Sequence, residues 1–267
     1  MKSKDCGPVM SFAYALYLCL IVVLGIVVFL MCRRYLALSW ILFLALPILL
    51  SPFWVQMEVN LAFTTWFGWA KLYSITFYAV LLLSILSRNP YAKKWPFYLV
   101  YWMMMLNLIQ PVLATGLARS FSINYPITIG GILLMLSTPG INAMRITKEK
   151  VRDFYWELSL PLVIGYTLWD LLFVCILFPM NILLQIAVLL APLLVLFKNK
   201  NLYFFPRVYS LAFYFMFYFT FPEWVIGTDL LLSVNEYIVV YGSMGVLAYL
   251  VFVFWISWKD RIKQIFT

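Results

Sequence analysis

Apolar stretches of about 20 residues recur along the chain, separated by short polar connections. A stretch of that length forms a helix that crosses the hydrocarbon core of a bilayer, because about 20 residues span some 30 Å. Of all residues 66% are apolar and only 11% are charged. This composition excludes a water-soluble fold, since too little polar sequence remains to cover one. The sequence therefore predicts an all-α integral membrane protein.

The stretches predict about nine transmembrane helices in a single bundle, so that residues 1–267 form one transmembrane domain. The predicted spans are 9–32, 35–57, 62–86, 95–118, 126–144, 155–179, 180–198, 206–223 and 231–257. The fifth span has an alternative, because Gly130-Gly131 and Pro139-Gly140 interrupt it. A re-entrant segment or a broken helix there would leave eight spans.

The basic residues predict the direction of the spans, because cytoplasmic loops collect lysine and arginine. Most of the 19 basic residues lie in every second connection and in the C-terminal tail, which places the N-terminus outside and the C-terminus in the cytoplasm. The segment from Arg145 to Asp153 is expected to be a solvated loop. We expect these loops to meet anionic lipids, so the net charge of +9 does not indicate nucleic-acid binding. The clusters are Arg33-Arg34, Arg88/Lys93/Lys94, Arg145/Lys148/Lys150/Arg152, Lys198/Lys200/Arg207 and Lys259/Arg261/Lys263.

Polar side chains of three spans are predicted at one depth in the membrane. At about 1.5 Å per residue, Lys71 and Asp170 each lie roughly 14 Å below the outer boundary, and Asn107 and Gln110 lie about 12–17 Å below it. A charge inside the membrane needs a partner, so we expect Lys71 and Asp170 to form an ion pair. That pair either orients the third and sixth spans, with the amides as interhelical hydrogen-bonding groups, or belongs to a ligand site.

The candidate ligand-binding residues surround this pair. Ser74 follows Lys71 at helical spacing, Tyr166 precedes Asp170 by one turn, and Glu236 lies nearer the outer surface. Toward the cytoplasm the spans are mostly aliphatic or aromatic, which predicts a vestibule that opens outward and is closed on the inner side by apolar side chains. The complete set is Lys71, Asp170, Asn107, Gln110, Tyr166, Ser74, Trp169 and Glu236.

The sequence gives little support for catalysis or metal binding. It contains no histidine, and its four cysteines are scattered, so neither a metal cluster nor a disulfide framework is indicated. No pair of carboxylates lies at one depth in the spans, as acid–base chemistry would require. We therefore assign no catalytic residue, metal or cofactor, and an intramembrane enzyme ranks third among the functions considered.

A transporter or solute-binding membrane protein for a small molecule is the favoured function. Polar groups on several helices and spans interrupted by glycine and proline build transporter sites, although the sequence shows no matching halves. The alternative is a membrane sensor, receptor or accessory subunit that signals through its basic cytoplasmic loops. Either function would be compatible with a membrane-protein partner or a homo-oligomer, with the lipid bilayer as the surroundings and no nucleic acid.

One string in the third span is distinctive, namely Trp66-Phe67-Gly68-Trp69-Ala70-Lys71-Leu72-Tyr73-Ser74. It is preceded by Leu46-Pro47-Ile48 and followed by Asn107 and by Tyr166-Thr167-Leu168-Trp169-Asp170. In these residues the chain resembles a family of bacterial multi-pass membrane proteins that is catalogued as a domain of unknown function. Family members resemble Tyr-Asp-Leu-Trp-Asn at the last run, so here the acid lies one helical turn further along. The resemblance covers most of the chain and implies a bacterial cytoplasmic membrane with no assigned activity.

Overall fold

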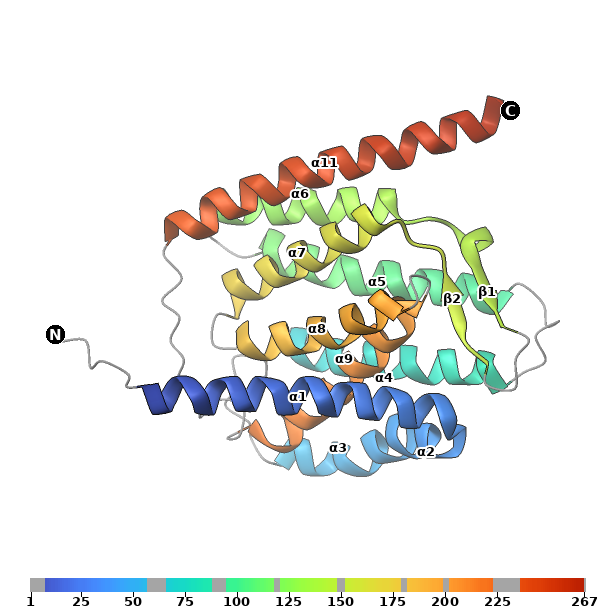
Figure 1. The fold of residues 1–267 in the computed structure, drawn as a ribbon, viewed down its shortest axis with the longest axis vertical. Coiled ribbons are helices and arrows are strands. Elements are labelled where there is room, and N and C mark those ends of the chain that lie inside the picture. Colours follow the sequence, from blue (N-terminus) through green and yellow to red (C-terminus); the bar gives the residue numbers. More distant parts are fainter. Residues whose placement is uncertain are drawn as a thin grey trace, which may run out of the picture.

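The computed structural model describes residues 8–56, 66–87, 95–117, 121–147, 152–178, 182–198, 202–222 and 236–266. Most of these residues form helices that run side by side, and one short β-hairpin lies at one end of the bundle (Figure 1). The helices are α1 (Pro8–Arg34), α2 (Leu36–Trp40), α3 (Leu46–Gln56), α4 (Trp66–Ser87), α5 (Trp95–Leu117), α6 (Phe121–Ser137), α7 (Leu160–Leu177), α8 (Ile182–Lys198), α9 (Phe204–Thr220) and α11 (Glu236–Phe266).

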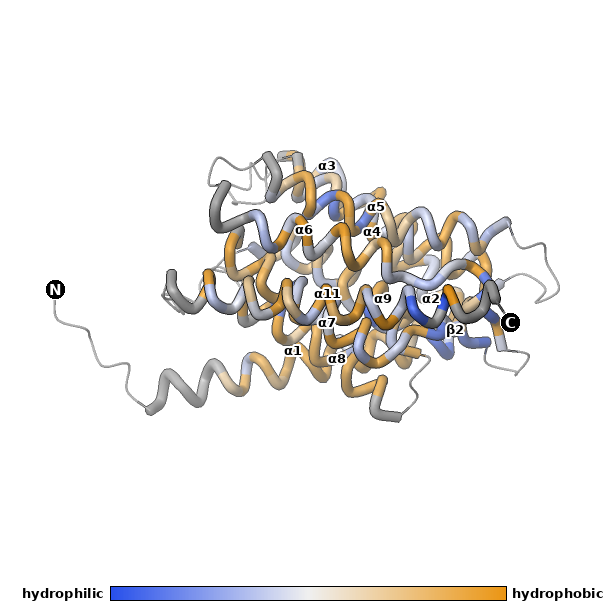
Figure 2. Tube along the Cα trace, turned by 90° about the horizontal axis from the view of Figure 1, so that it is seen from above, coloured by the Kyte–Doolittle hydropathy of each residue, from blue (hydrophilic) through white to orange (hydrophobic). Residues whose placement is uncertain are grey.

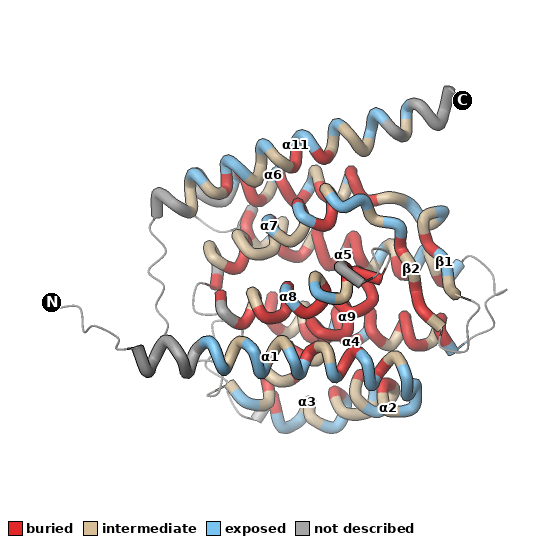
Figure 3. The backbone as a smooth tube through the Cα atoms, in the orientation of Figure 1, coloured by how far each residue is buried: buried red, intermediate tan, exposed pale blue. Residues whose placement is uncertain are grey.

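The lengths and surfaces of these helices agree with a membrane protein. Among the described residues, five helical segments are long and apolar enough to cross a membrane, namely Ala15–Arg34, Leu36–Val55, Phe67–Ser87, Trp95–Thr115 and Val239–Lys259. Many large apolar residues of the peripheral helices are exposed, including Leu20, Leu49 and Val251. Figures 2 and 3 colour the backbone by hydropathy and by burial and show hydrophobic and exposed positions along these helices. A soluble monomer rarely exposes so much contiguous apolar surface. The fold is thus consistent with an all-α membrane protein.

Helix α9 forms the centre of the bundle. It packs against α1, α4 and α8, and 13 of its 17 residues are buried. Its buried aromatic rings interlock with those of neighbouring helices, because edge-to-face packing is favourable for rings at this separation. Tyr209, for example, meets the ring of Phe43 at 4.9 Å and that of Phe205 at 4.7 Å between centroids. Any polar side chain on α9 is therefore held in the core.

The predicted second span is one continuous helical segment with a local irregularity. Helices α2 and α3 are joined by a π-helical turn, Ile41–Ala45, which ends two residues before Pro47. Proline has no N–H, and its ring collides with the carbonyl four residues earlier in a regular α-helix. A wider π turn is one way in which a helix accommodates such a disruption. Pro47 therefore follows a bulge in a continuous helical segment, while Pro52 lies inside α3.

The fifth predicted span is not broken at its glycines. Helix α6 is continuous through Gly130-Gly131 and ends at Ser137, before Pro139-Gly140. A Cβ atom on Gly131 would lie 2.4 Å from Cγ2 of Val112 on α5 and 2.9 Å from Cζ2 of Trp169 on α7. The glycines therefore let α6 approach α5 and α7 closely. The alternative of a helix broken at Gly130-Gly131 is wrong, although the helix does end before Pro139-Gly140.

The segment that was expected to be a solvated loop contains the β-hairpin. Strand β1 (Met144–Ile146) pairs antiparallel with β2 (Phe154–Trp156). Asp153 is buried and accepts two hydrogen bonds from Arg33 at the end of α1, at 2.6 Å from Nε and 2.5 Å from Nη2. The solvated-loop prediction is therefore wrong for Asp153, while residues 148–151 lie outside the described part of the chain. The ion pair fastens the hairpin to α1.

Candidate functional site

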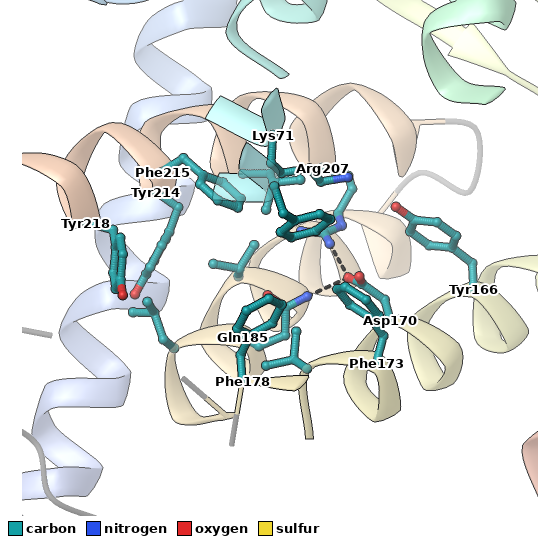
Figure 4. A pocket seen from close by; sticks show the side chains of 15 residues that line it. Lys71, Tyr166, Asp170, Phe173, Phe178, Gln185, Arg207, Tyr214, Phe215 and Tyr218 are labelled. Atoms are coloured by element: carbon teal, nitrogen blue, oxygen red, sulfur yellow. Dashed lines mark hydrogen bonds and ion pairs between the residues drawn. The ribbon is translucent and has the colours of Figure 1, made fainter. Parts of the chain in front are cut away.

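Asp170 of α7 is the centre of a buried polar cluster that joins three helices (Figure 4). Arg207 of α9 donates to its Oδ2 through Nη2, and Gln185 of α8 donates to the same oxygen at 2.5 Å. The side chains of Arg207 and Asp170 are only 4% and 13% exposed. In a low-dielectric core each of these charges compensates the other, and Gln185 adds a hydrogen bond to the carboxylate.

This geometry corrects two sequence predictions. The ion-pair partner of Asp170 is Arg207 and not Lys71, and Arg207 belongs to the buried core and not to a cytoplasmic loop. The loop assignment followed from its closeness in sequence to Lys198 and Lys200. The signal that could have placed it correctly is its position after Phe204-Phe205-Pro206, inside an apolar run.

Lys71 of α4 is held by α5. Its Nζ atom donates to the backbone oxygen and to Oδ1 of Asn107, both at 3.0 Å. The amide nitrogen of Asn107 donates to the Met103 carbonyl at 2.9 Å, which turns its oxygen toward the ammonium group. One turn further along, Ser74 donates to Lys71 O at 3.1 Å and to Oε1 of Gln110 at 3.3 Å. These contacts show that Lys71 and the two amides lie at one level of the neighbouring helices α4 and α5.

Lys71, Asp170 and Arg207 line one cavity, together with Gln185 and Tyr166. Its volume is about 60 Å³, measured as the space open to the centres of water-sized spheres. That is room for roughly four to six waters at about 10–15 Å³ each. Aromatic rings form much of the wall, and the rings of Phe67, Phe173 and Phe178 pack on one another with centroids 5.6–5.8 Å apart. The charged groups therefore face a small space that is otherwise apolar.

Several polar atoms at this cavity have no hydrogen-bond partner among the described residues. They are Nε and Nη1 of Arg207 and the hydroxyl of Tyr214, all of them buried. A buried donor without a partner costs about 1–3 kcal/mol, and more when it is charged. Buried polar groups of this kind are normally satisfied by ordered water or by a ligand. The cavity is large enough to hold either.

The remaining predicted residues have different positions. Tyr166 lines the cavity, with its ring centroid 6.0 Å from Cζ of Arg207. Trp169 is fully buried on another side of α7, where its Nε1 donates to the Ile127 carbonyl at 2.7 Å. Glu236 begins α11, and its side chain lies outside the described residues. The structure thus brings Lys71, Asp170 and Tyr166 to the cavity.

The other predicted residues do not line it. Asn107, Gln110 and Ser74 lie behind Lys71, and Trp169 lies apart. Within the described ranges, no group of three or more histidine, cysteine, aspartate or glutamate side chains is arranged to hold a metal ion. The site is therefore a cluster of charges and amides in an aromatic cavity.

Two further cavities follow the same face of α7 toward the hairpin. Tyr166 lines the first cavity and also a second one of about 10 Å³, which is otherwise mostly apolar. Leu162 lines this second cavity and also a third one of about 530 Å³, which Ser159 and Arg261 border as well. The residues 159, 162, 166, 170 and 173 follow one another at steps of three and four, so they lie on one helix face.

A comparison with known protein families agrees with the family resemblance seen in the strings around Lys71 and Asp170. No curated protein and no solved structure matches the chain significantly. The model of one protein family, described as a family of unknown function (DUF5692), matches residues 10–265. The match includes the string around Lys71, the amide at position 107 and the run that ends at Asp170. Because it covers nearly the whole sequence, the chain belongs to this family of unknown function, DUF5692.

Proposed function

We propose that the protein is a multi-pass membrane transporter that binds a small molecule in the cavity beside Lys71, Asp170 and Arg207. The proposal includes the topology of about nine spans in one domain over residues 1–267, with the N-terminus outside. The expected location is the cytoplasmic membrane of a bacterium. Lys71, Asp170 and Tyr166 contact the ligand, while Asn107, Gln110 and Ser74 position Lys71.

The energetic cost of the charged cluster supports a functional role. An ionisable side chain at the centre of a membrane helix costs roughly 2.5–3.5 kcal/mol on insertion scales. Three such side chains, from α4, α7 and α9, line one cavity in this bundle. A purely structural contact between these helices could be made by apolar packing at lower cost, because well-packed hydrophobic residues replace buried ion pairs without loss of stability. Charged groups at this depth are typical of substrate and ion pathways.

The row of cavities along α7 is the observation that supports transport and not only ligand binding. The charged cavity is separated from the next space by Tyr166, and that space from the third by Leu162. A transporter needs a central site and a closed path that a modest movement of side chains or helices can open. We infer that the apolar side chains between the cavities form the inner gate. This agrees with the mostly aliphatic and aromatic sequence of the spans on their cytoplasmic side.

The basic side chains support the proposed orientation of the bundle. At the hairpin end, Arg33 binds Asp153, Arg152 donates to the Leu86 carbonyl, and Arg261 donates to the Leu136 and Thr138 carbonyls. Cytoplasmic ends of membrane helices collect such cations. We therefore propose that the hairpin end lies in the cytoplasm, where it meets anionic lipids.

A proteoliposome experiment tests the proposal. Vesicles with the wild-type protein are incubated with a mixed metabolite extract, washed, and their contents are compared by mass spectrometry with those of vesicles that carry Leu211→Trp. Leu211 is a buried residue of the cavity wall, so the indole fills the space. We expect a set of compounds that accumulates only with the wild type. Identical contents would overturn transport, and binding without accumulation would reduce the function to solute binding.

A further inference from the structure

The charges that face the cavity do not balance. Lys71 and Arg207 are cations and Asp170 is the anion, so these three lining residues carry a net charge of +1. Within the part of the chain that the structure describes, no carboxylate forms an ion pair with Lys71, whose ammonium group donates to neutral oxygens of Asn107. An uncompensated cation in an apolar core is unfavourable unless a counter-charge reaches it.

Donors without a partner among the described residues belong to a cation that lines this cavity. Arg207 uses Nη2 for Asp170, while its Nε and Nη1 atoms are buried and have no hydrogen-bond partner among the described residues. The guanidinium group presents five N–H donors in a fixed plane and accepts no hydrogen bond. The ligand atoms that satisfy it must therefore be acceptors, and charged acceptors satisfy it best. The hydroxyl of Tyr214, which also has no partner among the described residues, lies away from Arg207 on the side of Tyr218 (Figure 4).

The walls determine the remainder of the ligand. Phe67, Phe173 and Phe178 form one ring cluster, and Phe215 lines the same space (Figure 4). Cavities of this composition bind molecules that have an apolar body and one polar group to fix their orientation. A fully hydrated inorganic ion would leave the aromatic wall without a contact. The cavity volume of about 60 Å³ restricts the apolar body of the ligand to a small size.

We propose that the cavity binds a small organic monoanion, of the carboxylate class, with a compact apolar or aromatic body. Its anionic group accepts hydrogen bonds from Arg207 and neutralises the excess charge next to Lys71. Its body lies against the phenylalanine cluster. This inference rests on the proposed function, because it names the class of molecule that the same cavity binds.

The test compares three probes of nearly equal shape with different charge. Labelled benzoate, benzamide and benzylamine are equilibrated with the full-length protein in nanodiscs, and the bound fraction is measured for each. We expect benzoate to bind at least about tenfold more tightly than benzamide, because charge-assisted hydrogen bonds to arginine are roughly twice as strong as neutral ones, and benzylamine to bind least. Arg207→Gln should abolish the preference for benzoate. Arg34→Gln, an exposed arginine at the end of α1, should leave it unchanged.

A second variant covers the case that Arg207→Gln fails to fold. Lys71→Gln removes the excess positive charge and keeps an amide donor for Asn107, so it should fold and bind benzoate several-fold more weakly. The inference is overturned if benzoate binds no better than benzamide, if no probe binds, or if chloride or phosphate displaces benzoate as well as another aromatic carboxylate does. The metabolite experiment decides independently whether the proposed function stands, since accumulated compounds that are neutral or cationic would support transport and contradict only this inference.

Discussion

Replacement of Asp170 by asparagine should destabilise the protein more than any other single change in the polar cluster. Breaking a buried ion pair by removal of one partner costs about 3–5 kcal/mol, because the remaining charge stays buried and uncompensated. The Arg207 side chain is only 4% exposed and Lys71 lines the same cavity, so Asp170→Asn leaves two cations without an anion. We therefore expect a loss near the upper end of that range.

The reciprocal change should cost less. In Arg207→Gln, Asp170 keeps the hydrogen bond from Gln185 and has Lys71 across the cavity, so the loss should be about 3 kcal/mol. The double variant should lose less than Asp170→Asn alone, because it removes both charges. This non-additivity is the signature of a coupled pair.

Equilibrium unfolding in mixed detergent and dodecyl sulfate, followed by tryptophan fluorescence, measures these differences. The matched control is Glu157→Gln, which breaks an exposed ion pair with Arg145 at 3.2 Å and should cost at most about 1 kcal/mol. Equal losses for Asp170→Asn and Glu157→Gln would refute the reasoning, since they would mean that the buried pair experiences no low-dielectric surroundings.

Three further outcomes follow from the contacts. Gly131→Ala should lower the free energy of unfolding by about 1–3 kcal/mol, because the added methyl group overpacks the contact with α5 and α7. Gly245→Ala is the control, since no atom lies within 4 Å of its added methyl group, and it should not destabilise the protein. Equal melting temperatures of the two variants would contradict this. Asn107→Leu should cost about 1.5–3 kcal/mol in the same unfolding assay, because a hydrogen bond to a charged group is lost. A cysteine introduced at Val174, in a variant without the native cysteines, reports access to the charged cavity from the hairpin side. Tyr166→Ala should speed its labelling by a maleimide, because Tyr166 lines both this cavity and the next one. An unchanged labelling rate would mean that Tyr166 is not part of the gate.

The sequence predicted the helices well because hydropathy and length dominate helix formation in lipid. The structure has helices at 95–117 and 182–198 where spans were predicted at 95–118 and 180–198. In the structure Lys71 contacts Asn107, and Ser74 contacts Gln110, between residues that the sequence placed at one level without predicting these contacts. The common level of these residues could be predicted because α4 and α5 are adjacent in sequence and antiparallel, so that a constant rise per residue gives the relative positions of their side chains.

The ion pair and the hairpin could not be predicted by the same reasoning. Arg207 reaches Asp170 because α9 passes through the core and an arginine side chain is long, and neither fact follows from depth along a single helix. The strand residues Tyr155 and Trp156 were merged with the following helix in the predicted span 155–179, because both are aromatic and the strand covers only three residues. Which residues pair across distant helices depends on packing, which hydropathy and depth along single helices do not give.

The most direct measurement is a high-resolution cryo-electron microscopy map of the full-length protein, purified without added ligand and reconstituted in nanodiscs. The account predicts non-protein density in the cavity, within hydrogen-bond distance of Nη1 of Arg207, and its absence in Leu211→Trp prepared in parallel. A collapsed cavity, in which Nε and Nη1 of Arg207 are bound by other side chains of the protein, would contradict it and leave the charged cluster as a contact between helices.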